Sequence, residues 1–282
     1  MPAPGKTDAM LNTNQTAQTT QVGEMLRMWR QRRRLSQLAL ACDADVSPRH
    51  LSFLETGRSR PSRQMLTHLA ELLDIPPRDR NSLLLAAGFA PLHTETPLDN
   101  PKAADGRRAV EFLLASHEPS PALAADRHWT LVAANRAVGL FLEGVAPGLL
   151  EPPINVLRLS LHPQGLAPRI VDLRQWRRHA LERLQKQIDA SGDKELMALY
   201  TELEAYPCGP ASDGRKPDDH GYGAIIVPLR VRSDEGVLSF LTTTTVFGTA
   251  VDLTFSELAI ESFFPADDFT AEALRKRMPT ED

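Results

Sequence analysis

The 282-residue chain has few cysteines, few aromatic residues and no long apolar run. Its two cysteines, Cys42 and Cys208, can form neither a disulfide framework nor a metal site with the usual ligand spacing. We therefore expect a reducing, cytoplasmic setting and no bound metal. No run approaches the roughly 18 apolar residues of a membrane helix, and the N-terminus lacks the apolar core of a signal peptide. These absences argue against membrane insertion and against export.

Motifs of catalysis are also missing. The sequence contains no Gly-x-Ser-x-Gly, no His-Glu-x-x-His and no Cys-x-x-Cys. The eight histidines lack metal-ligand spacing. We expect that the protein is not an enzyme, and that it needs no cofactor beyond a small ligand.

What is present is an ordinary globular composition with an uneven charge. Hydrophobic residues make up 42% of the chain, enough for one or two packed domains. The net charge of −4 by itself argues against nucleic acid, but residues 20–63 hold nine arginines, no lysine and four acidic residues. That segment carries +5 and the rest of the chain −9. A basic module on an acidic body indicates a polyanionic partner; the alternative is a solvated helix face.

Residues 21–91 have the pattern of five short helices. Apolar residues recur at helical spacing in the first of them, and Ser36, Ser47 and Ser62 stand where helix N-caps are expected. Two short helices joined by a tight turn, with the second starting at Ser47, predict a helix-turn-helix. Residues 1–20 are polar and without periodicity, which predicts a disordered tail, and the proline-rich residues 92–109 predict a linker.

Residues 110–282 mix two periodicities. Helices are predicted over residues 135–141, 173–190, 194–205 and 270–277. Strands are predicted over residues 129–133, 224–232, 237–246 and 258–264, and a loop over 208–222. The predicted fold is therefore multidomain: an all-α five-helix domain, then an α+β domain with an antiparallel sheet.

The first domain resembles a known family. The resemblance lies in Leu35-Ser36-Gln37, in Val46-Ser47-Pro48-Arg49-His50-Leu51-Ser52-Phe53-Leu54-Glu55-Thr56-Gly57-Arg58 and in Pro61-Ser62, which together are similar to the Xre/Cro-type helix-turn-helix repressors. This resemblance implies a lambda-repressor-like fold that binds double-stranded DNA. Asp45 stands in the turn where the family usually has glycine, and aspartate tolerates the left-handed conformation better than most residues.

The resemblance and the physics of recognition assign residues to DNA. The candidates for base contacts are Ser47, Pro48, Arg49, Ser52 and Phe53. Arg49 is foremost because its fork matches guanine O6 and N7; the alternatives are a phosphate contact or a free surface residue. The candidates for phosphate contacts are Gln37, Arg58, Arg60 and Arg63; the alternatives are a capping side chain for Gln37 and solvated charges for the arginines. In the family, the position of Glu55 pairs with a basic residue of the first helix, which corresponds to Arg30.

A longer pattern resembles the MmyB-like regulators. It includes residues 80–91, 129–137, 155–158, 162–163 and 264–267. Members are repressors or activators with a PAS-like C-terminal domain, and the resemblance implies a small apolar ligand such as a fatty acid.

Candidate pocket residues follow from the apolar pattern of this second domain. They are Phe141, Leu157, Leu161, Trp176, Ile226, Leu238, Phe240 and Phe247; the alternative for each is plain core. Arg158 and His162 are four residues apart on a short helix and could hold a carboxylate, the alternative being an ion pair with an acidic residue.

Together these observations predict a sequence-specific transcription regulator, a homodimer, whose C-terminal domain binds a small apolar ligand that modulates DNA binding. Two alternatives stay open. The C-terminal domain could serve only dimerisation or partner binding, or it could act on an acyl or aromatic substrate.

Overall fold

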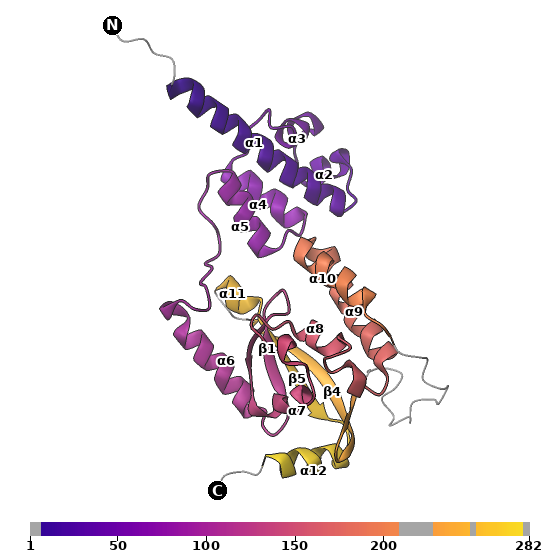
Figure 1. Ribbon diagram of the computed structural model, residues 1–282. Coiled ribbons are helices and arrows are strands. Elements are labelled where there is room, and N and C mark those ends of the chain that lie inside the picture. The colour runs from indigo at the N-terminus through magenta and orange to yellow at the C-terminus, as the bar shows by residue number, and fades with distance from the viewer. Residues whose placement is uncertain (1–6, 209–227, 249–251, 279–282) are drawn as a thin grey trace. The chain divides into compact units, whose positions relative to one another are not determined.

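The chain folds into two units (Figure 1). The structure is a computed structural model that describes residues 7–208, 228–248 and 252–278. Backbone contacts divide the chain into Met1–Thr94 and Glu95–Asp282. The division falls inside the segment 92–109 that was predicted as a linker, although that segment also holds the beginning of a helix.

The first unit is all-helical. Its helices are α1 (Thr7–Arg32), α2 (Gln37–Asp43), α3 (Pro48–Glu55), α4 (Arg63–Leu72) and α5 (Pro77–Ala86). Ser36, Ser47 and Ser62 cap α2, α3 and α4, each accepting a hydrogen bond from the backbone N–H three residues on. Leucines from all five helices and the fully buried Trp29 form one core. The predicted five-helix fold is confirmed.

Helix α1 is longer than the sequence suggested. A disordered tail was predicted over residues 1–20, but the helix begins at Thr7; residues 1–6 lie outside the described residues. Polar threonine, asparagine and glutamine residues argue against burial, yet they do not forbid a helix. Residues 7–22 contain neither proline nor glycine, so nothing interrupts a helix that is anchored further along by Val22 and Leu26.

The second unit is built on a five-stranded antiparallel sheet of order β2-β1-β5-β4-β3. The strands are β1 (Ala122–Ala125), β2 (Leu131–Ala134), β3 (Leu229–Ser233), β4 (Gly236–Val246) and β5 (Ala259–Pro265). The alternation of a strand is clear in β1: Leu123 and Ala125 face the larger apolar cluster, and Ala122 and Ala124 face the smaller one.

Helices cover both faces of this sheet (Figure 1). Helix α6 packs Val110 and Leu114 on the face of the smaller cluster. The larger cluster takes its helical residues from α7, α8, α9, α10 and α12. The helices of this unit are α6 (Ala104–Ser116), α7 (Gly139–Leu142), α8 (Val156–Leu161), α9 (Leu173–Ser191), α10 (Lys194–Ala205), α11 (Leu253–Ser256) and α12 (Asp268–Arg277). Short 3-10 turns lie at Pro101–Ala103, Arg136–Val138, Pro147–Leu149 and Ala167–Arg169. The predicted α+β class is confirmed.

Three details differ from the sequence prediction. Strand β1 was not predicted, because its Ala-Leu-Ala-Ala sequence lacks the β-branched and aromatic residues typical of strands. Trp129 was assigned to a strand but has a positive φ of 66° and is buried just before β2 begins. The predicted strand over 224–232 is present from Leu229 on, whereas residues 209–227, with most of the predicted loop, lie outside the described residues.

Candidate functional site

Helix α3 is held at a fixed angle by its neighbours. Leu51 and Leu54 are buried, and Gly23 of α1 lets the two helices meet: a Cβ on Gly23 would lie 2.5 Å from the carbonyl oxygen of Leu54. The turn before α3 places Asp45 in the left-handed region, with φ 52°. The geometry is that of a helix-turn-helix, with the N-terminus of α3 free of packing.

The exposed side of α3 carries the predicted base-contact residues. Ser47, Pro48 and Arg49 are exposed, and Ser52 and Phe53 are half-buried. The guanidinium carbon of Arg49 lies 5.3 Å from the centre of the Phe53 ring, a cation–π contact that restrains the arginine without using its N–H groups. In the described residues Arg49 has no ion pair. The Oγ of Ser47 already accepts the capping bond from His50, which leaves its O–H donor and one lone pair for a base.

The predicted ion pair between Arg30 and Glu55 is present. Arg30 donates from Nε and Nη2 to the two carboxylate oxygens of Glu55, at 2.6 and 2.9 Å. Burial by itself raises the pKa of Glu55, but the bonds from Arg30 and Gln37 outweigh burial and hold that pKa below its usual range. The pair joins α1 to the end of α3, so it helps to fix the position of α3 without contacting DNA itself.

Gln37 belongs to this internal network. Its Nε2 donates to Oε2 of Glu55 at 2.8 Å, and the cap of α2 is Ser36 rather than Gln37. The amide is therefore half-buried and engaged. A phosphate contact by Gln37 remains a prediction, and the bond to Glu55 would orient it.

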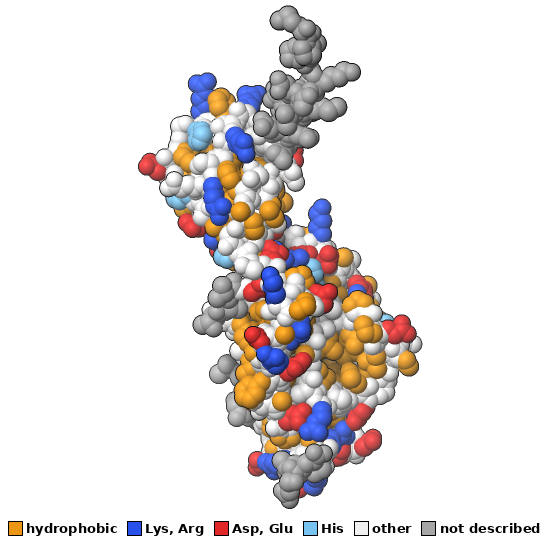
Figure 2. All heavy atoms as spheres, turned by 90° about the vertical axis from the view of Figure 1, so that its left-hand side faces the viewer, with side chains coloured by type: hydrophobic (Ala, Val, Ile, Leu, Met, Phe, Trp, Pro, Cys, Tyr) orange, Lys and Arg blue, Asp and Glu red, His pale blue; other side chains and the backbone are white. Residues whose placement is uncertain are grey.

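Five other arginines of the basic segment fall into two groups. Arg58 and Arg63 are exposed and have no ion pair among the residues described, and Arg63 opens α4, where the helix dipole favours a phosphate. Others bind the protein itself. Arg60 donates to the carbonyl of Ala87 at 3.3 Å, Arg33 donates to the carbonyls that end α4, and Arg32 lies 5.0 Å from the Trp29 ring. Basic side chains nevertheless stand out on the upper unit in Figure 2.

The second unit encloses an apolar cavity of about 80 Å³ between the sheet and helices α8 and α9. Phe141, Leu157 and Trp176, predicted as pocket residues, line it. The other lining residues come from both walls: Leu123, Trp129, Val138, Val156, Leu159, Ser160, Leu166, His179, Ala180, Arg183, Leu229, Thr242, Glu261 and Phe263.

Other predicted pocket residues lie elsewhere. Leu161, Leu238 and Phe240 are buried in the adjoining core, the alternative that had been weighed for them. Phe247 packs against the cluster on the opposite face of the sheet, and Ile226 lies outside the described residues.

The predicted carboxylate holders are also placed differently. Arg158 donates to both carboxylate oxygens of Glu202, at 2.6 and 2.7 Å, so the alternative of an ion pair is the observed one. The bonds to Glu202, which outweigh burial, raise the pKa of Arg158. His162 ends α8 with ψ 140° and lies against the edge of Tyr206. Tyr206 in turn donates to Glu202, so Arg158 and His162 both lie around this carboxylate of the protein itself.

Five polar side chains that were not predicted as pocket residues line the cavity: Ser160, His179, Arg183, Thr242 and Glu261. Arg183 donates to the carboxylate oxygens of Glu261 at 3.0 and 2.5 Å, and Thr244 donates to the same carboxylate at 2.9 Å. The Arg183 guanidinium lies 4.5 Å from the Trp129 ring. His179, one turn earlier on α9, has its pKa lowered by burial and by the charge of Arg183. The spacing of His179 and Arg183 on an amphipathic helix was a readable signal; their partner on β5 was not.

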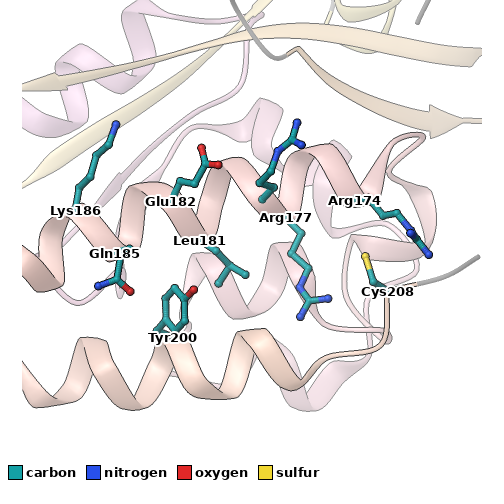
Figure 3. A pocket seen from close by; sticks show the side chains of 9 residues that line it. Arg174, Arg177, Leu181, Glu182, Gln185, Lys186, Tyr200 and Cys208 are labelled. Carbon is teal, nitrogen blue, oxygen red and sulfur yellow. The ribbon is translucent and has the colours of Figure 1, made fainter. Parts of the chain in front are cut away.

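A second, open hollow of about 740 Å³ lies along α9 and α10 (Figure 3). Leu181 of α9 and Tyr200 of α10 supply its apolar surface, and Arg174, Arg177, Arg178 and Lys186 make it basic. None of the predicted pocket residues lines it.

Two searches of the described residues found nothing. No group of three or more histidine, cysteine, aspartate or glutamate side chains there could hold a metal ion. None of the helices described is long and apolar enough to cross a membrane.

Two family models match the chain. One, described as a helix-turn-helix domain, matches residues 21–83. The other, the MmyB-like transcription regulator ligand binding domain, matches residues 107–276, more than half of the chain. The chain belongs to the MmyB-like transcription regulators. This MmyB-like regulator therefore has a helix-turn-helix DNA-binding domain and a ligand-binding domain, and both matches are to regulators rather than enzymes.

Other comparisons add little to this MmyB-like assignment. No curated protein matches the chain. A solved structure titled as that of an RNA-binding Light-Oxygen-Voltage receptor is similar at 12% identity and a TM-score of 0.25. The alignment covers 95% of this chain and 64% of that one, and at so low a score it carries no argument about fold or function.

Proposed function

We propose that this MmyB-like regulator binds specific DNA sites as a homodimer, through the exposed side of α3, and that a small apolar ligand in the second unit modulates that binding. A fatty acid is one candidate ligand. A single helix-turn-helix makes few base contacts. Two DNA-binding units of a dimer, on half-sites about one helical turn apart, would read enough base pairs to distinguish a specific site.

The observation that carries the ligand half of the proposal is the cavity between the sheet and α9. Its wall is mostly aliphatic and aromatic, which is the usual character of a site for a small apolar ligand. A cavity of about 150 Å³ holds benzene, and this one measures about 80 Å³. A ligand must therefore widen it, and in this proposal the ligand does so by moving α9 away from the sheet.

Movement of α9 offers a physical route for regulation. The Arg183–Glu261 pair ties α9 to β5, and the cavity lies beside it. A ligand that separates α9 from the sheet changes the second unit. The difference between its binding free energies for the two arrangements is the most that can be passed to the DNA-binding unit.

The test is the native mass of the purified full-length protein, compared with its denatured mass. The proposal expects a dimer that carries a few hundred extra daltons per subunit, lost on denaturation. A dimer without added mass that also fails to bind any alkyl compound would favour a second unit that serves dimerisation alone. A monomer that binds its DNA site tightly would contradict the dimer.

A further inference from the structure

Some polar side chains of the cavity wall already have hydrogen-bond or ion-pair partners in the protein, and others do not. Arg183, the cationic side chain of the cavity wall, spends two N–H groups on Glu261, and Glu261 also accepts from Thr244. The pair is electrically neutral, and the Glu261 side chain is 9% exposed. Breaking a buried pair leaves a charge without compensation, which is costly. An incoming anion would meet a guanidinium whose charge is already compensated, with the Glu261 carboxylate beside it.

Two other side chains of the wall are unengaged. His179 and Thr242 line the cavity, and neither side chain has a hydrogen-bond partner among the described residues. His179 lies beside Trp176, with ring centres 5.9 Å apart, and the indole N–H of Trp176 already donates to Ser160. Arg183 keeps three of its five N–H groups, but its charge is compensated by Glu261. The uncharged hydrogen-bonding groups left free in the cavity wall are one imidazole and the hydroxyl groups of Thr242 and Ser160.

Burial lowers the pKa of His179 and so favours the neutral imidazole near pH 7, although Glu182 and Glu261 act in the opposite direction. Burial is the main cause of its lowered pKa, and Arg183 acts in the same direction. The charged groups that act on it are Arg183, Glu182 and Lys186 of α9 and Glu261 of β5. Thr242 of β4 and Ser160 of α8 carry no charge. A neutral imidazole offers one donor and one acceptor.

We infer that the cavity selects a ligand with an apolar body and a single uncharged hydrogen-bonding group, read by His179 with Thr242 and Ser160, and that it rejects a free carboxylate. The inference rests on the proposed function, because it needs the cavity to be the ligand site. A hydroxyl, a primary amide or an un-ionised carboxylic acid fits. An ionised carboxylate does not, because burying it without a free cation costs more than the apolar chain gains. A fatty acid enters as the protonated acid.

The test compares three head groups on one chain: n-octanol, octanamide and octanoate, titrated into the full-length protein. Trp129 and Trp176 line the cavity, so intrinsic fluorescence reports binding. Octanol and octanamide should bind equally at pH 7 and pH 9. Octanoate should weaken about 100-fold over that range, because the un-ionised fraction falls tenfold per pH unit above the carboxyl pKa of about 4–5.

Variants of His179 separate its role from packing. His179→Gln keeps a neutral donor and acceptor and should bind octanol within about threefold of the parent protein. His179→Phe keeps a ring without polar atoms and should bind octanol and octanamide at least tenfold more weakly. Thermal unfolding of each variant shows that the fold is retained.

Three results would overturn the inference. Octanoate that binds equally at pH 7 and pH 9, or more tightly than octanol at pH 9, would show that the charged head group is read. Equal octanol binding by both His179 variants would show that His179 does not read the head group. If none of the three compounds binds at either pH, the apolar-ligand proposal falls together with the inference.

Discussion

Arginines that look alike in the basic segment have different roles at the residue scale. Arg30 is buried against Glu55, Arg33 donates to the carbonyls at the end of α4, and Arg49 is exposed over Phe53. Only the exposed group can meet DNA without loss of an internal contact. The charge of +5 over residues 20–63 therefore overstates what phosphates and bases can use.

Arg49→Ala should weaken binding to the specific DNA site by about 1–3 kcal/mol and relax the preference at one base pair. Arg49→Lys should not restore that preference, because an ammonium group lacks the two-pronged fork. The measurement is affinity, at one fixed salt concentration, for the operator and for its single-base variants. Arg108→Ala, an exposed arginine of α6 paired with Asp105, is the control and should leave affinity unchanged. An equal loss on every sequence would make Arg49 a phosphate contact.

Glu55→Gln should lower the free energy of unfolding of the first unit by about 3–5 kcal/mol at pH 7, because Arg30 would keep a buried charge without its partner. The folded-state pKa of Glu55 lies below its unfolded value of about 4.3. The stabilisation is thus complete above the unfolded pKa and is lost as the pH falls through the folded pKa. Urea unfolding from pH 7 to pH 3 measures both effects. Parallel pH profiles for the parent and the variant would show that the pair adds no stability.

At the element scale, the residues at the helix ends determine where the helices of the helix-turn-helix begin and how they are joined. Serine caps begin α2, α3 and α4, and the turn before α3 needs a left-handed residue, which is Asp45. Each cap is worth about 1 kcal/mol. Both features depend on local backbone geometry, which is why they could be predicted from the sequence.

Asp45→Gly should raise the free energy of unfolding by about 0.5–1 kcal/mol, because glycine adopts a positive φ without a Cβ clash. Asp45→Ala should lower it, since alanine keeps the clash and loses the polar side chain. Thermal unfolding midpoints of the three proteins provide the comparison. A variant with alanine that matches the one with glycine would show that the φ of residue 45 does not limit stability.

Helices and strands could be predicted where local sequence signals are sufficient. They could not be predicted where the conformation depends on pairing with distant segments. The helix predicted over 194–205 coincides with α10, and the one predicted over 173–190 ends one residue before α9 does. Strand β1 owes its conformation to β2 and β5, because its alanines carry little preference. The cavity was missed in the same way: Arg183 and Glu261 are 78 residues apart, and only the fold brings them together. For Arg158 the ion pair was one of the two alternatives, but its partner Glu202 could not be named because it lies on another helix.

At the scale of the whole molecule, the segment that binds DNA and the rest of the chain, which includes the ligand-binding unit, carry net charges of opposite sign. Residues 20–63 carry +5 and the rest of the chain carries −9, so attraction to the polyanionic duplex comes from the helix-turn-helix. A ligand-binding unit of opposite sign adds no affinity for DNA of its own. A defect confined to the cavity should therefore leave DNA binding intact and remove only the response to ligand.

Ala180→Leu tests that separation. Ala180 lines the cavity from α9 and is 7% exposed, and leucine adds three carbon atoms to a space of about 80 Å³. Overpacking is expected to cost about 1–3 kcal/mol at most. The variant should lose its fluorescence response to octanol and still bind the specific DNA site with the affinity of the unliganded parent protein.

The matched control is Ala190→Leu, an exposed alanine of the same helix, which should change neither property. If Ala180→Leu still binds octanol with unchanged affinity, the ligand site is not this cavity. The hollow lined by Leu181 and Tyr200 would then be the next site to block. If the variant loses DNA binding without ligand, the second unit has a role besides ligand binding, because its core must then support the DNA-binding arrangement of the protein.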